Sequence, residues 1–453
     1  MDRSVLVRAC LCIGVLCASP LAGCGSSSTG TSVTQSGPGP AGQNGYYVYW
    51  DQNEELDFVA MPSGQQGRMV APWDVNGQMC IVPDGSGRFS TAYNPTLPDQ
   101  RNPGGLKPYM QPPVGEVLWN RNGSFSGQTI SVSGPYKLPG QSAGGDIPPD
   151  AKGNHAYNNN GTYTGCVFDA HGNLFATDIA TAQGPFPTPD DGRLVEWFAP
   201  SYTAFCVVLG PNKGGDGPHH VDGTGGLKEP GLLTLDSNGD VLLPQAGAAN
   251  ILRVDHSTLP SSASDCTPDG LMAAGKVHTS EFITVAADQL AFFPESIVRD
   301  PSCGCWAVGS VIGDPAIAWY DDHGQPLLQR GTVPGTKLGD NSGYNPFGLA
   351  FAPDGTLFFV DVHITCVNNQ LSNCGPVDYG GRIMKVNFVG GKPSAPVQIA
   401  TGFDFPISVT VCVPAKQTCP WPTTVTPPGS GPSENNAPAT GPSTTAPATA
   451  ADG

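Results

Sequence analysis

The chain has 453 residues, enough for one large domain or two ordinary ones, and its formal net charge is −17. This acidic balance argues against nucleic acid or an anionic membrane face as a partner. Glycine (60) and proline (46) are abundant, only 13% of the residues are charged, and no long amphipathic helical pattern occurs. These features predict an all-β fold that is rich in turns.

Residues 1–23 have the pattern of an export signal. Two arginines flank the start of an apolar run that is too short for a stable membrane span, and small residues follow it. The run ends in LAGC, which resembles the lipobox of bacterial lipoproteins. The resemblance implies that Cys24 becomes the acylated N-terminus and anchors the protein to a membrane of the bacterial cell envelope, outside the cytoplasm. The alternative is ordinary cleavage that leaves a free cysteine.

Two further segments differ in composition from the body of the chain. Residues 24–44 are rich in Gly, Ser, Thr and Pro, which predicts a flexible tether between lipid and fold. Residues 427–453 lack apolar residues other than Ala, which predicts a disordered tail. The folded domain is therefore expected at 45–426.

Cysteine usage fits export. An even number of cysteines, ten, follows Cys24, and outside the cytoplasm this favours disulfides over metal sites. The spacing of Cys303 and Cys305 does not fit a zinc knuckle. Two pairs are close enough in sequence to clip loops or hairpins, namely Cys366 with Cys374 and Cys412 with Cys419.

A hairpin pattern recurs five times along the folded body. In each copy, Asp or Asn leads into a glycine between two apolar strands, which is the turn chemistry that lets a hairpin close, because glycine accepts a positive φ. The glycines of the five turns are at positions 77, 172, 239, 304 and 355.

A second pattern is a later strand, usually led by Gly and rich in aromatic residues. It occurs six times, at 45–51, 115–120, 192–198, 250–255, 315–321 and 381–387. The sixth hairpin is expected in the C-terminal segments 407–411 and 419–425. Because a four-stranded unit buries its faces only against neighbours, we predict a six-bladed β-propeller. Its last blade would combine these two inner strands with outer strands 46–51 and 56–61.

In such a ring, the loops that precede the innermost strands and those that follow the second strands open on one end, and long loops there usually bind. The largest expected loops are 92–114, 133–160 and 211–228. Polar residues at these positions are Tyr163, Glu229, Glu295, Asn345 and Asp404 before inner strands, and Asp84, Asp178, Gln245, Ser310 and Asp361 after second strands. Oxygen ligands of this kind suit Ca²⁺, which takes roughly six to eight of them. The alternative is that they cap strands and bind water.

The segment 346–361 (PFGLAFAPDGTLFFVD) resembles the regucalcin/gluconolactonase and NHL-repeat superfamily of six-bladed propellers, and 229–243 repeats its pattern. The resemblance implies a divalent cation, Ca²⁺ or Zn²⁺, held by a Glu, an Asn and an Asp, here Glu295, Asn345 and Asp178. Asp361 would also lie near the cation, as a catalytic residue, and His363, two residues further on, or an acid would be the catalytic base. The family commonly has Asn between Pro and Gly of the motif, and this chain has Phe347 there.

These observations predict an exported, lipid-anchored propeller that acts as a binding or interaction module through its loop-rich face. Its ligand would be a small molecule, a glycan or a protein, and not nucleic acid. A metal-dependent hydrolase of lactone or ester bonds is the alternative, and a quinone-dependent sugar dehydrogenase is a third hypothesis.

Overall fold

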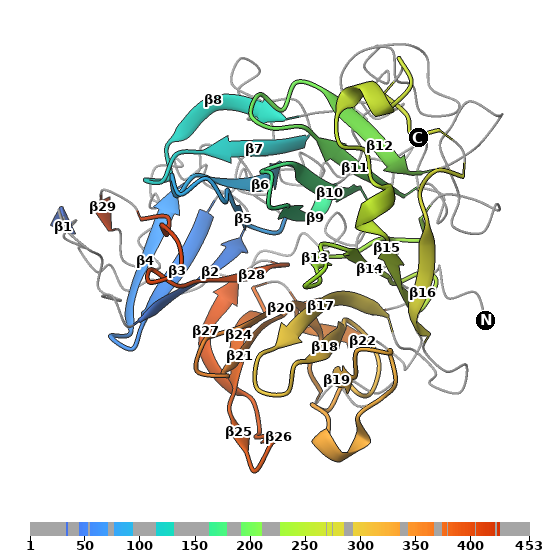
Figure 1. Ribbon diagram of the computed structural model, residues 1–453. Helices are drawn as coiled ribbons and strands as arrows, with labels where there is room; N and C mark the ends of the chain where they lie inside the picture. The colour runs from blue at the N-terminus through green and yellow to red at the C-terminus, as the bar shows by residue number, and fades with distance from the viewer. Residues whose placement is uncertain are drawn as a thin grey trace, which may run out of the picture.

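The protein is described by a computed structural model (Figure 1). The described residues are 33–34, 45–52, 55–70, 77–93, 115–130, 163–178, 192–210, 227–268, 270–273, 275–284, 293–335, 343–366, 374–377, 379–403, 405–421 and 424–425. The predicted signal with Cys24, most of the predicted tether and the C-terminal tail lie outside them. Among the described residues, no helix is long and apolar enough to cross a membrane.

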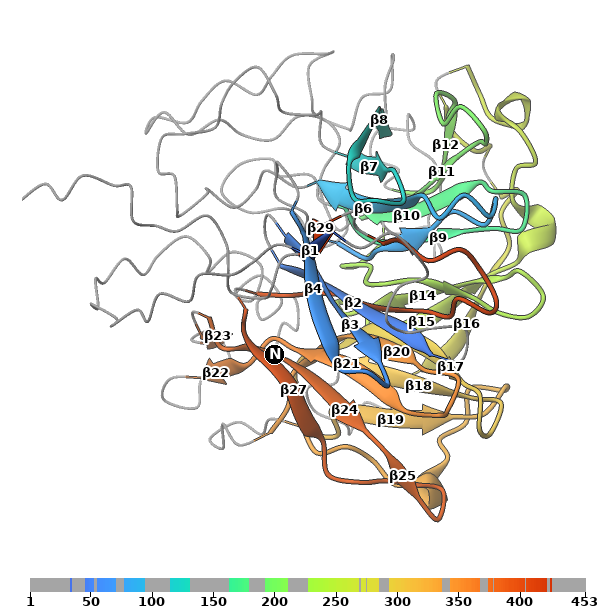
Figure 2. The same cartoon turned by 90° about the vertical axis from the view of Figure 1, so that its left-hand side faces the viewer.

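Six antiparallel sheets surround a common axis, which confirms the all-β, six-bladed propeller (Figures 1 and 2). We number the blades in chain order and give their strands from the axis outward. Blade 1 contains β5 (Cys80–Ile81), β6 (Phe89–Tyr93), β7 (Gly115–Trp119) and β8 (Phe125–Ile130). Blade 2 contains β9 (Tyr163–Phe168), β10 (Leu174–Asp178), β11 (Arg193–Trp197) and β12 (Phe205–Leu209). Blade 3 contains β13 (Thr234–Leu235), β14 (Val241–Gln245), β15 (Asn250–Val254) and β16 (Thr279–Thr284).

The remaining blades vary this plan. Blade 4 has three strands, β17 (Pro294–Asp300), β18 (Cys305–Ser310) and β19 (Ile317–Tyr320), with Val333 bridged to Ile317 at the edge. Blade 5 contains β20 (Pro346–Phe351), β21 (Leu357–Asp361), β24 (Gly381–Val386) and β27 (Val397–Phe403). Blade 6 contains β28 (Val409–Cys412), β2 (Tyr46–Gln52), β3 (Glu55–Met61) and β4 (Gln65–Val70).

The core lies between the faces of neighbouring blades. Every residue of β10, β11, β14 and β21 is buried. These strands are mostly apolar and do not alternate regularly between apolar and polar residues, as expected for strands covered on both faces. Large aromatic side chains such as Trp50, Trp197 and Trp306 are fully or almost fully buried in the core. Each sheet therefore needs both neighbours to bury its faces, which explains why the blades close into a ring.

The recurring Asp-x-x-Gly turns close hairpins as predicted. In blade 3, Asp236 accepts hydrogen bonds at Oδ1 from the backbone N–H groups of Asn238 (2.8 Å) and Asp240 (3.1 Å). Gly239 has φ +88°, a conformation that other residues adopt with strain. The aspartate thus supplies the bonds of the turn and the glycine supplies its backbone conformation.

The first hairpin differs from the prediction. Its turn is at residues 82–88 and not at Gly77, so Cys80–Ile81 is the innermost strand of blade 1 and Phe89–Tyr93 the second. Gly77 instead lies where the chain approaches this inner strand, and its N–H points to Asp51 of blade 6 (3.3 Å). The sequence contains two Asp-to-Gly turn signals in close succession there, and the more C-terminal one closes the hairpin.

The closing blade joins the two ends of the folded body, but its division differs from the prediction. One strand comes from the C-terminal side, β28, which pairs with β2 in the register Tyr47↔Cys412 and Trp50↔Val409. Three strands come from the N-terminal side, so 45–51 is a second strand and not a third. The fourth, Gln65–Val70, is polar in sequence and was missed; it forms a strand because buried Arg68 pairs with buried Asp57 across the sheet (2.9 Å).

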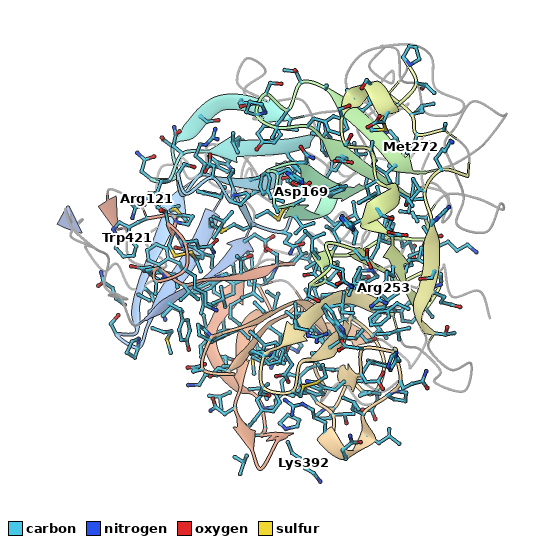
Figure 3. The ribbon with its side chains drawn as sticks, in the orientation of Figure 1. Arg121, Asp169, Arg253, Met272, Lys392 and Trp421 are labelled. Carbon is cyan, nitrogen blue, oxygen red and sulfur yellow. A yellow bond between two sulfur atoms is a disulfide. The ribbon has the colours of Figure 1, made fainter. Side chains whose placement is uncertain are left out.

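The C-terminal segment leaves the ring after β28. A disulfide joins Cys412 to Cys419, and Arg121 of blade 1 holds the returning chain. Its Nε donates to the carbonyl of Cys419 (2.9 Å), and its own carbonyl accepts from the N–H of Trp421 (2.7 Å) (Figure 3). Beyond this point β29 (Thr424–Val425) pairs with β1 (Val33–Thr34), so 419–425 adds no inner strand to blade 6.

Three further disulfides are present, Cys80–Cys166, Cys206–Cys266 and Cys303–Cys305. The first ties the inner strands of blades 1 and 2 together. Cys366 faces Cys374 in the ladder of β22 (Ile364–Cys366) with β23 (Cys374–Pro376), so the hairpin expected there exists, and its disulfide stays a prediction. Disulfides of this number fit an oxidising compartment.

Candidate functional site

The two ends of the ring are built differently. At the mouth end, inner strands begin and second strands finish, and the connections there are long, at 94–114, 131–162, 179–192 and 210–233. At the turn end, the first two strands of blades 1 to 5 are joined by short hairpins, at 82–88, 169–173, 236–240, 301–304 and 352–356. The long connection at the turn end, 255–278, is held by the Cys206–Cys266 disulfide.

Asp51 ends the second strand of blade 6 at the mouth and links three segments. Its carboxylate accepts hydrogen bonds from the N–H groups of Ile407 (3.2 Å), Ser408 (2.6 Å) and Gly77 (3.3 Å). Burial raises its pKa to about 7, although the bonds from Ser408 and Ile407 favour the charged form. Asp51 was not predicted, because its role depends on segments more than three hundred residues away.

Asp178, a predicted metal ligand, ends β10 of blade 2. Its Oδ2 lies 2.6 Å from Nε of Arg193, and both side chains are fully buried. The pair is formed across the sheet, because Asp178 and Arg193 are directly opposite in the register of β10 and β11. The carboxylate therefore already has a positively charged partner inside the protein.

Blade 5 repeats this arrangement with Asp361 and Arg382, which are opposite in β21 and β24 and form an ion pair. The other oxygen of Asp361 accepts from the backbone N–H groups of Asn345 (2.9 Å) and His363 (3.1 Å). Among the described residues, the imidazole of His363 is not a partner of Asp361. The structure thus brings Asp361, Asn345 and His363 together, but the bonds to Asp361 come from the backbone N–H groups of the other two residues.

The side chain of Asn345 is also engaged by the backbone. Its Nδ2 donates to the carbonyl of Val311 (2.9 Å), and its Oδ1 accepts from the N–H of Ile364 (2.9 Å). Asn345 thus joins the chain that follows β18 of blade 4 to the chain that follows β21 of blade 5. Gln245 and Ser310 act similarly, since Gln245 accepts from the N–H of Lys228 (2.8 Å) and Ser310 accepts from that of Phe293 (2.8 Å).

Glu295 and Glu229 form a pair of buried acids at the mouth. Glu295 is the second residue of β17 in blade 4, and Glu229 precedes the inner strand of blade 3; they are 4% and 7% exposed. The strands are held together where Leu232 N–H donates to the Glu295 carbonyl (2.7 Å). Burial, and then the nearby charge of Glu229, raise the pKa of Glu295 well above its usual value. Two acids so placed can share a proton or bind a cation.

Backbone conformation marks two of these positions. Glu229 (φ 52°) and His363 (φ 50°) both lie in the left-handed region, although neither is glycine. Such conformations are strained and are concentrated at functional sites and tight connections. The sequence gives no sign of this strain at either position.

Other predicted mouth residues have different fates. Asp84 lies in the first hairpin at the turn end, where it pairs with Arg88 (2.7 Å), because the first hairpin was displaced. Tyr163 is fully buried at the start of β9, with Arg193 3.5 Å from its hydroxyl. Asp404 lies outside the described residues.

Arg193 and Arg382 were missed as partners of the predicted acids. A signal for them is present in the sequence, since both follow a glycine at the start of the third strand of their blades (GRLVEW and GRIMKV). In each blade an aspartate ends the preceding strand, so the hairpin register alone puts the charges opposite each other.

Two clusters of side chains with metal-ligand chemistry occur among the described residues, both at the turn end. One consists of Asp240, Asp255 and His256, beside which Arg253 lies 3.8 Å from Asp240 (Figure 3). The other consists of Asp300, Cys303 and Cys305, in which the two sulfurs are joined.

Comparison with known proteins gives no family model and no curated protein that matches this chain. Solved structures do resemble it. A calcium-binding protein, regucalcin, from Agrobacterium tumefaciens is 14% identical with a TM-score of 0.39, covering 69% of this chain and 77% of that one. A Lactobacillus plantarum protein is 10% identical with a TM-score of 0.42, covering 81% and 99%. A nidogen/laminin complex is 10% identical with a TM-score of 0.43, covering 81% of this chain and 98% of that one. Similarity this low carries no argument about activity.

Proposed function

We propose that this propeller is a binding module that contacts its ligand, a small molecule, a glycan or a protein, at the mouth end. The observation that carries the proposal is the asymmetry of the ring: the long connections 94–114, 131–162, 179–192 and 210–233 join strands at the mouth end, whereas the long connection at the turn end, 255–278, is held by a disulfide. Tight hairpins at the other end leave less surface for variation. A rigid scaffold with long loops on one face is a common design for recognition.

The use of the mouth acids supports binding over hydrolysis. Asp178 and Asp361 are paired with arginines, and the side chain of Asn345 is engaged by backbone groups. Groups with such partners hold the blades together and are poorly placed to ligate a cation. The lipid on Cys24, if export proceeds as the sequence predicts, would present this module outside the cytoplasm.

Site-specific photo-crosslinking tests the proposal. Tyr379 at the mouth end is 53% exposed and Leu328 at the turn end is 80% exposed, so either position can carry a benzoylphenylalanine. Irradiation of cells that produce the full chain should give a discrete higher-mass adduct from position 379 and none from the control position 328. Adducts from 328 alone, or from neither position, would contradict a mouth-end interaction.

A second candidate is a metal-dependent hydrolase of lactone or ester bonds, which the buried pair Glu229 and Glu295 favours. Two carboxylates close enough for one to raise the pKa of the other would bind Ca²⁺ or Zn²⁺ with release of protons. The cation would polarise a substrate carbonyl, and His363 or a carboxylate would act as base. Neither arginine-paired aspartate is needed in this arrangement.

Melting of chelator-treated protein with added Ca²⁺ or Zn²⁺ tests this candidate. Binding at 100 times the dissociation constant should stabilise the fold by about 2.7 kcal/mol. Glu295→Gln should abolish the increase in melting temperature, and Glu281→Gln, at an exposed position, should not. An unchanged melting temperature together with no turnover of a δ-lactone would exclude it.

A further inference from the structure

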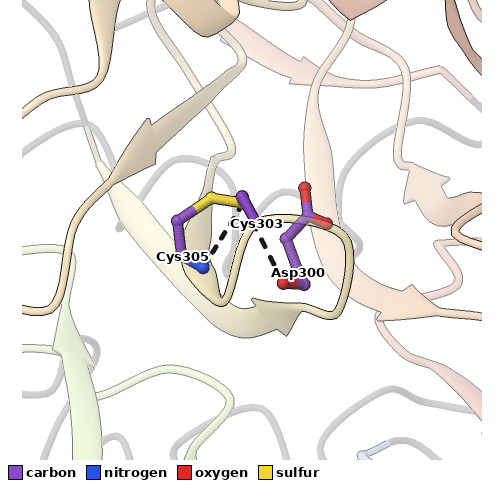
Figure 4. A group of neighbouring side chains, drawn as sticks. All are labelled: Asp300, Cys303 and Cys305. Atoms are coloured by element: carbon purple, nitrogen blue, oxygen red, sulfur yellow. Dashed lines mark hydrogen bonds between the residues drawn. A yellow bond between two sulfur atoms is a disulfide. The ribbon is translucent and has the colours of Figure 1, made fainter. Parts of the chain in front are cut away.

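The hairpin turn of blade 4 contains the disulfide Cys303–Cys305 (Figure 4). This turn lies at the opposite end of the ring from the mouth. The turn, 301–304, joins β17 to β18, and one glycine separates the two cysteines. The proposed binding function gives this bridge no role. Four features of its surroundings indicate what it does.

The first feature is the size of the loop that the bridge closes. The separation in sequence is 2, against 86 for Cys80–Cys166 and 60 for Cys206–Cys266. A disulfide stabilises a fold largely by restricting the unfolded chain, and the effect grows with loop length. The bridge in the turn therefore contributes the least of the four to stability, and the fold does not depend on it.

The second feature is access. Cys303 is exposed, whereas Cys305 is 4% exposed. In the other short-range bridge, Cys412–Cys419, the two residues are 0% and 4% exposed. A thiol in solution can therefore reach Cys303 from outside, and exchange requires that the attacking group reach one sulfur along the axis of the bond.

The third feature is the charge around Cys303. The backbone N–H of Cys305 points to Sγ of Cys303, and the distance from nitrogen to sulfur is 3.3 Å (Figure 4). Arg299 borders the turn, since a Cβ placed on Gly304 would lie 3.4 Å from its Nη2. The hydrogen bond from this N–H favours a thiolate over a neutral thiol at Cys303. The guanidinium of Arg299 is itself paired with Asp322, and a carboxylate oxygen of Asp300 lies within 4.8 Å of both sulfurs.

The fourth feature is a scaffold that keeps the turn in place. Asp300 accepts from the N–H (2.9 Å) and hydroxyl (2.7 Å) of Ser302, from Trp319 Nε1 (3.0 Å) and from Arg330. Both oxygens are thus in use, which disfavours a metal site built from Asp300 and the reduced cysteines. None of these bonds involves the sulfurs, so the turn keeps its shape when the bridge opens.

We propose that Cys303–Cys305 is a thiol–disulfide exchange site for small-molecule thiols, with Cys303 as the sulfur that is attacked. A thiolate RS⁻ bonds to Sγ of Cys303, the bond to Cys305 breaks, and Cys305 takes the electron pair and then a proton from water. A second RS⁻ attacks the RS sulfur of the mixed disulfide, so that RSSR forms and Cys303 leaves as the thiolate. Two thiols are oxidised, the bridge gains two electrons, and a small disulfide restores it by the reverse reaction.

Differential alkylation tests the assignment in the oxidised full chain. The protein is incubated with reduced glutathione at pH 7, quenched with N-ethylmaleimide and analysed by peptide mass spectrometry. Cys303 and Cys305 should be labelled at least about tenfold faster than Cys412 and Cys419, the matched short-range pair, and the glutathione adduct should be on Cys303. The proposal would be overturned if Cys303 and Cys305 were labelled no faster than Cys412 and Cys419, or if neither pair were labelled. It would also be overturned if the glutathione adduct were on Cys305.

Substitutions separate exchange from a merely structural bridge. When Cys305→Ser is incubated with glutathione disulfide, the Cys303 thiolate should attack it and release one glutathione thiolate, and the adduct should stay on Cys303 because no neighbouring thiol displaces it. The double variant Cys303→Ser/Cys305→Ser should abolish glutathione oxidation and melt within a few degrees of the parent, because the loop is short.

Discussion

The mouth end and the turn end of this ring use acidic residues in opposite ways. At the turn end, Asp236 binds N–H groups two and four residues further along the chain, and Asp169 does the same for His171 and Asn173. At the mouth end, Asp51 binds Ile407, 356 residues away. The turn-end acids shape local hairpins, whereas the mouth-end acids join strands and blades. An acidic residue therefore stabilises either its own hairpin or the contact between blades, according to its partners.

The difference extends to ionisation. At the turn end, a hydrogen bond from Arg299 lowers the pKa of exposed Asp322. In the interior, burial raises the pKa of Asp51 to about 7 and that of Glu116 to about 8. We therefore expect changes at the turn end to be tolerated, and changes at the mouth and in the interior to affect the whole ring.

The largest effect should come from removing residues 45–70. This deletes three of the four strands of blade 6 and exposes the facing surfaces of blades 1 and 5. Cooperative thermal unfolding, followed by circular dichroism, should be lost. Removal of 427–453 is the control and should leave the transition unchanged. A truncated ring that melts cooperatively near the parent temperature would mean that closure by blade 6 is not essential.

A change of pH should have the next largest effect. Burial raises the pKa values of Asp51, Glu116 and Glu196 to about 7, 8 and 9. The folded state holds these protons while the unfolded chain, with ordinary pKa values near 4, has lost them. Stability should therefore fall as pH rises from about 5 to about 9, by several kcal/mol in all.

Melting temperatures measured across this range check the sign. Glu116→Gln removes one titrating group and should flatten the curve, and Glu281→Gln, at the exposed position, should leave it as in the parent. A melting temperature that rises between pH 5 and pH 9 would show that these carboxyls are ionised in the folded protein.

Ion pairs at the two ends provide the sharpest matched comparison. Arg193→Ala leaves Asp178 buried without this partner and should cost about 3–5 kcal/mol. Arg88→Ala breaks a pair in which both side chains are at least one-third exposed, and should cost roughly 0–1 kcal/mol. Denaturant unfolding of the two variants measures both values. Equal losses would remove the distinction between the two ends.

A glycine substitution at the turn end should also have a small effect. Gly355, in the blade 5 hairpin, has φ +84°, and a Cβ added there would meet no atom within 4 Å beyond its chain neighbours. Gly355→Ala should therefore cost only about 1–2 kcal/mol, from backbone strain. Gly348 is the control at the mouth end, where a Cβ would lie 2.8 Å from the carbonyl oxygen of Ile407. The Gly348→Ala variant should unfold at lower denaturant concentration than Gly355→Ala.

Much of the architecture could be read from the sequence, because local chemistry repeats in each blade. The hairpins at Gly172, Gly239, Gly304 and Gly355 are where the Asp-to-Gly pattern predicts them. The prediction failed at Gly77, where two turn signals compete, and at Gln65–Val70, which has no apolar alternation. Neither outcome is decided by the local pattern: at Gly77 two local signals compete, and Gln65–Val70 is recognisable as a strand only through its pairing with Glu55–Met61.

The candidate site was less predictable for the same reason. The positions of Asp178, Asp361 and Asn345 at strand ends follow from the repeat. Their partners follow from register and from the packing of one blade on the next. Glu229 raises the pKa of Glu295 only because the first strands of blades 3 and 4 lie side by side.

The sequence by itself determined the all-β class, the number of blades and the pairing of the two ends of the folded body. These depend on apolar strands and Asp–Gly turns, whose effects reach only a few residues along the chain. The tertiary structure alone decided how many strands each end gives to blade 6 and which acids come close together at the mouth. Those outcomes depend on contacts between residues far apart in sequence, and no local pattern encodes such distances.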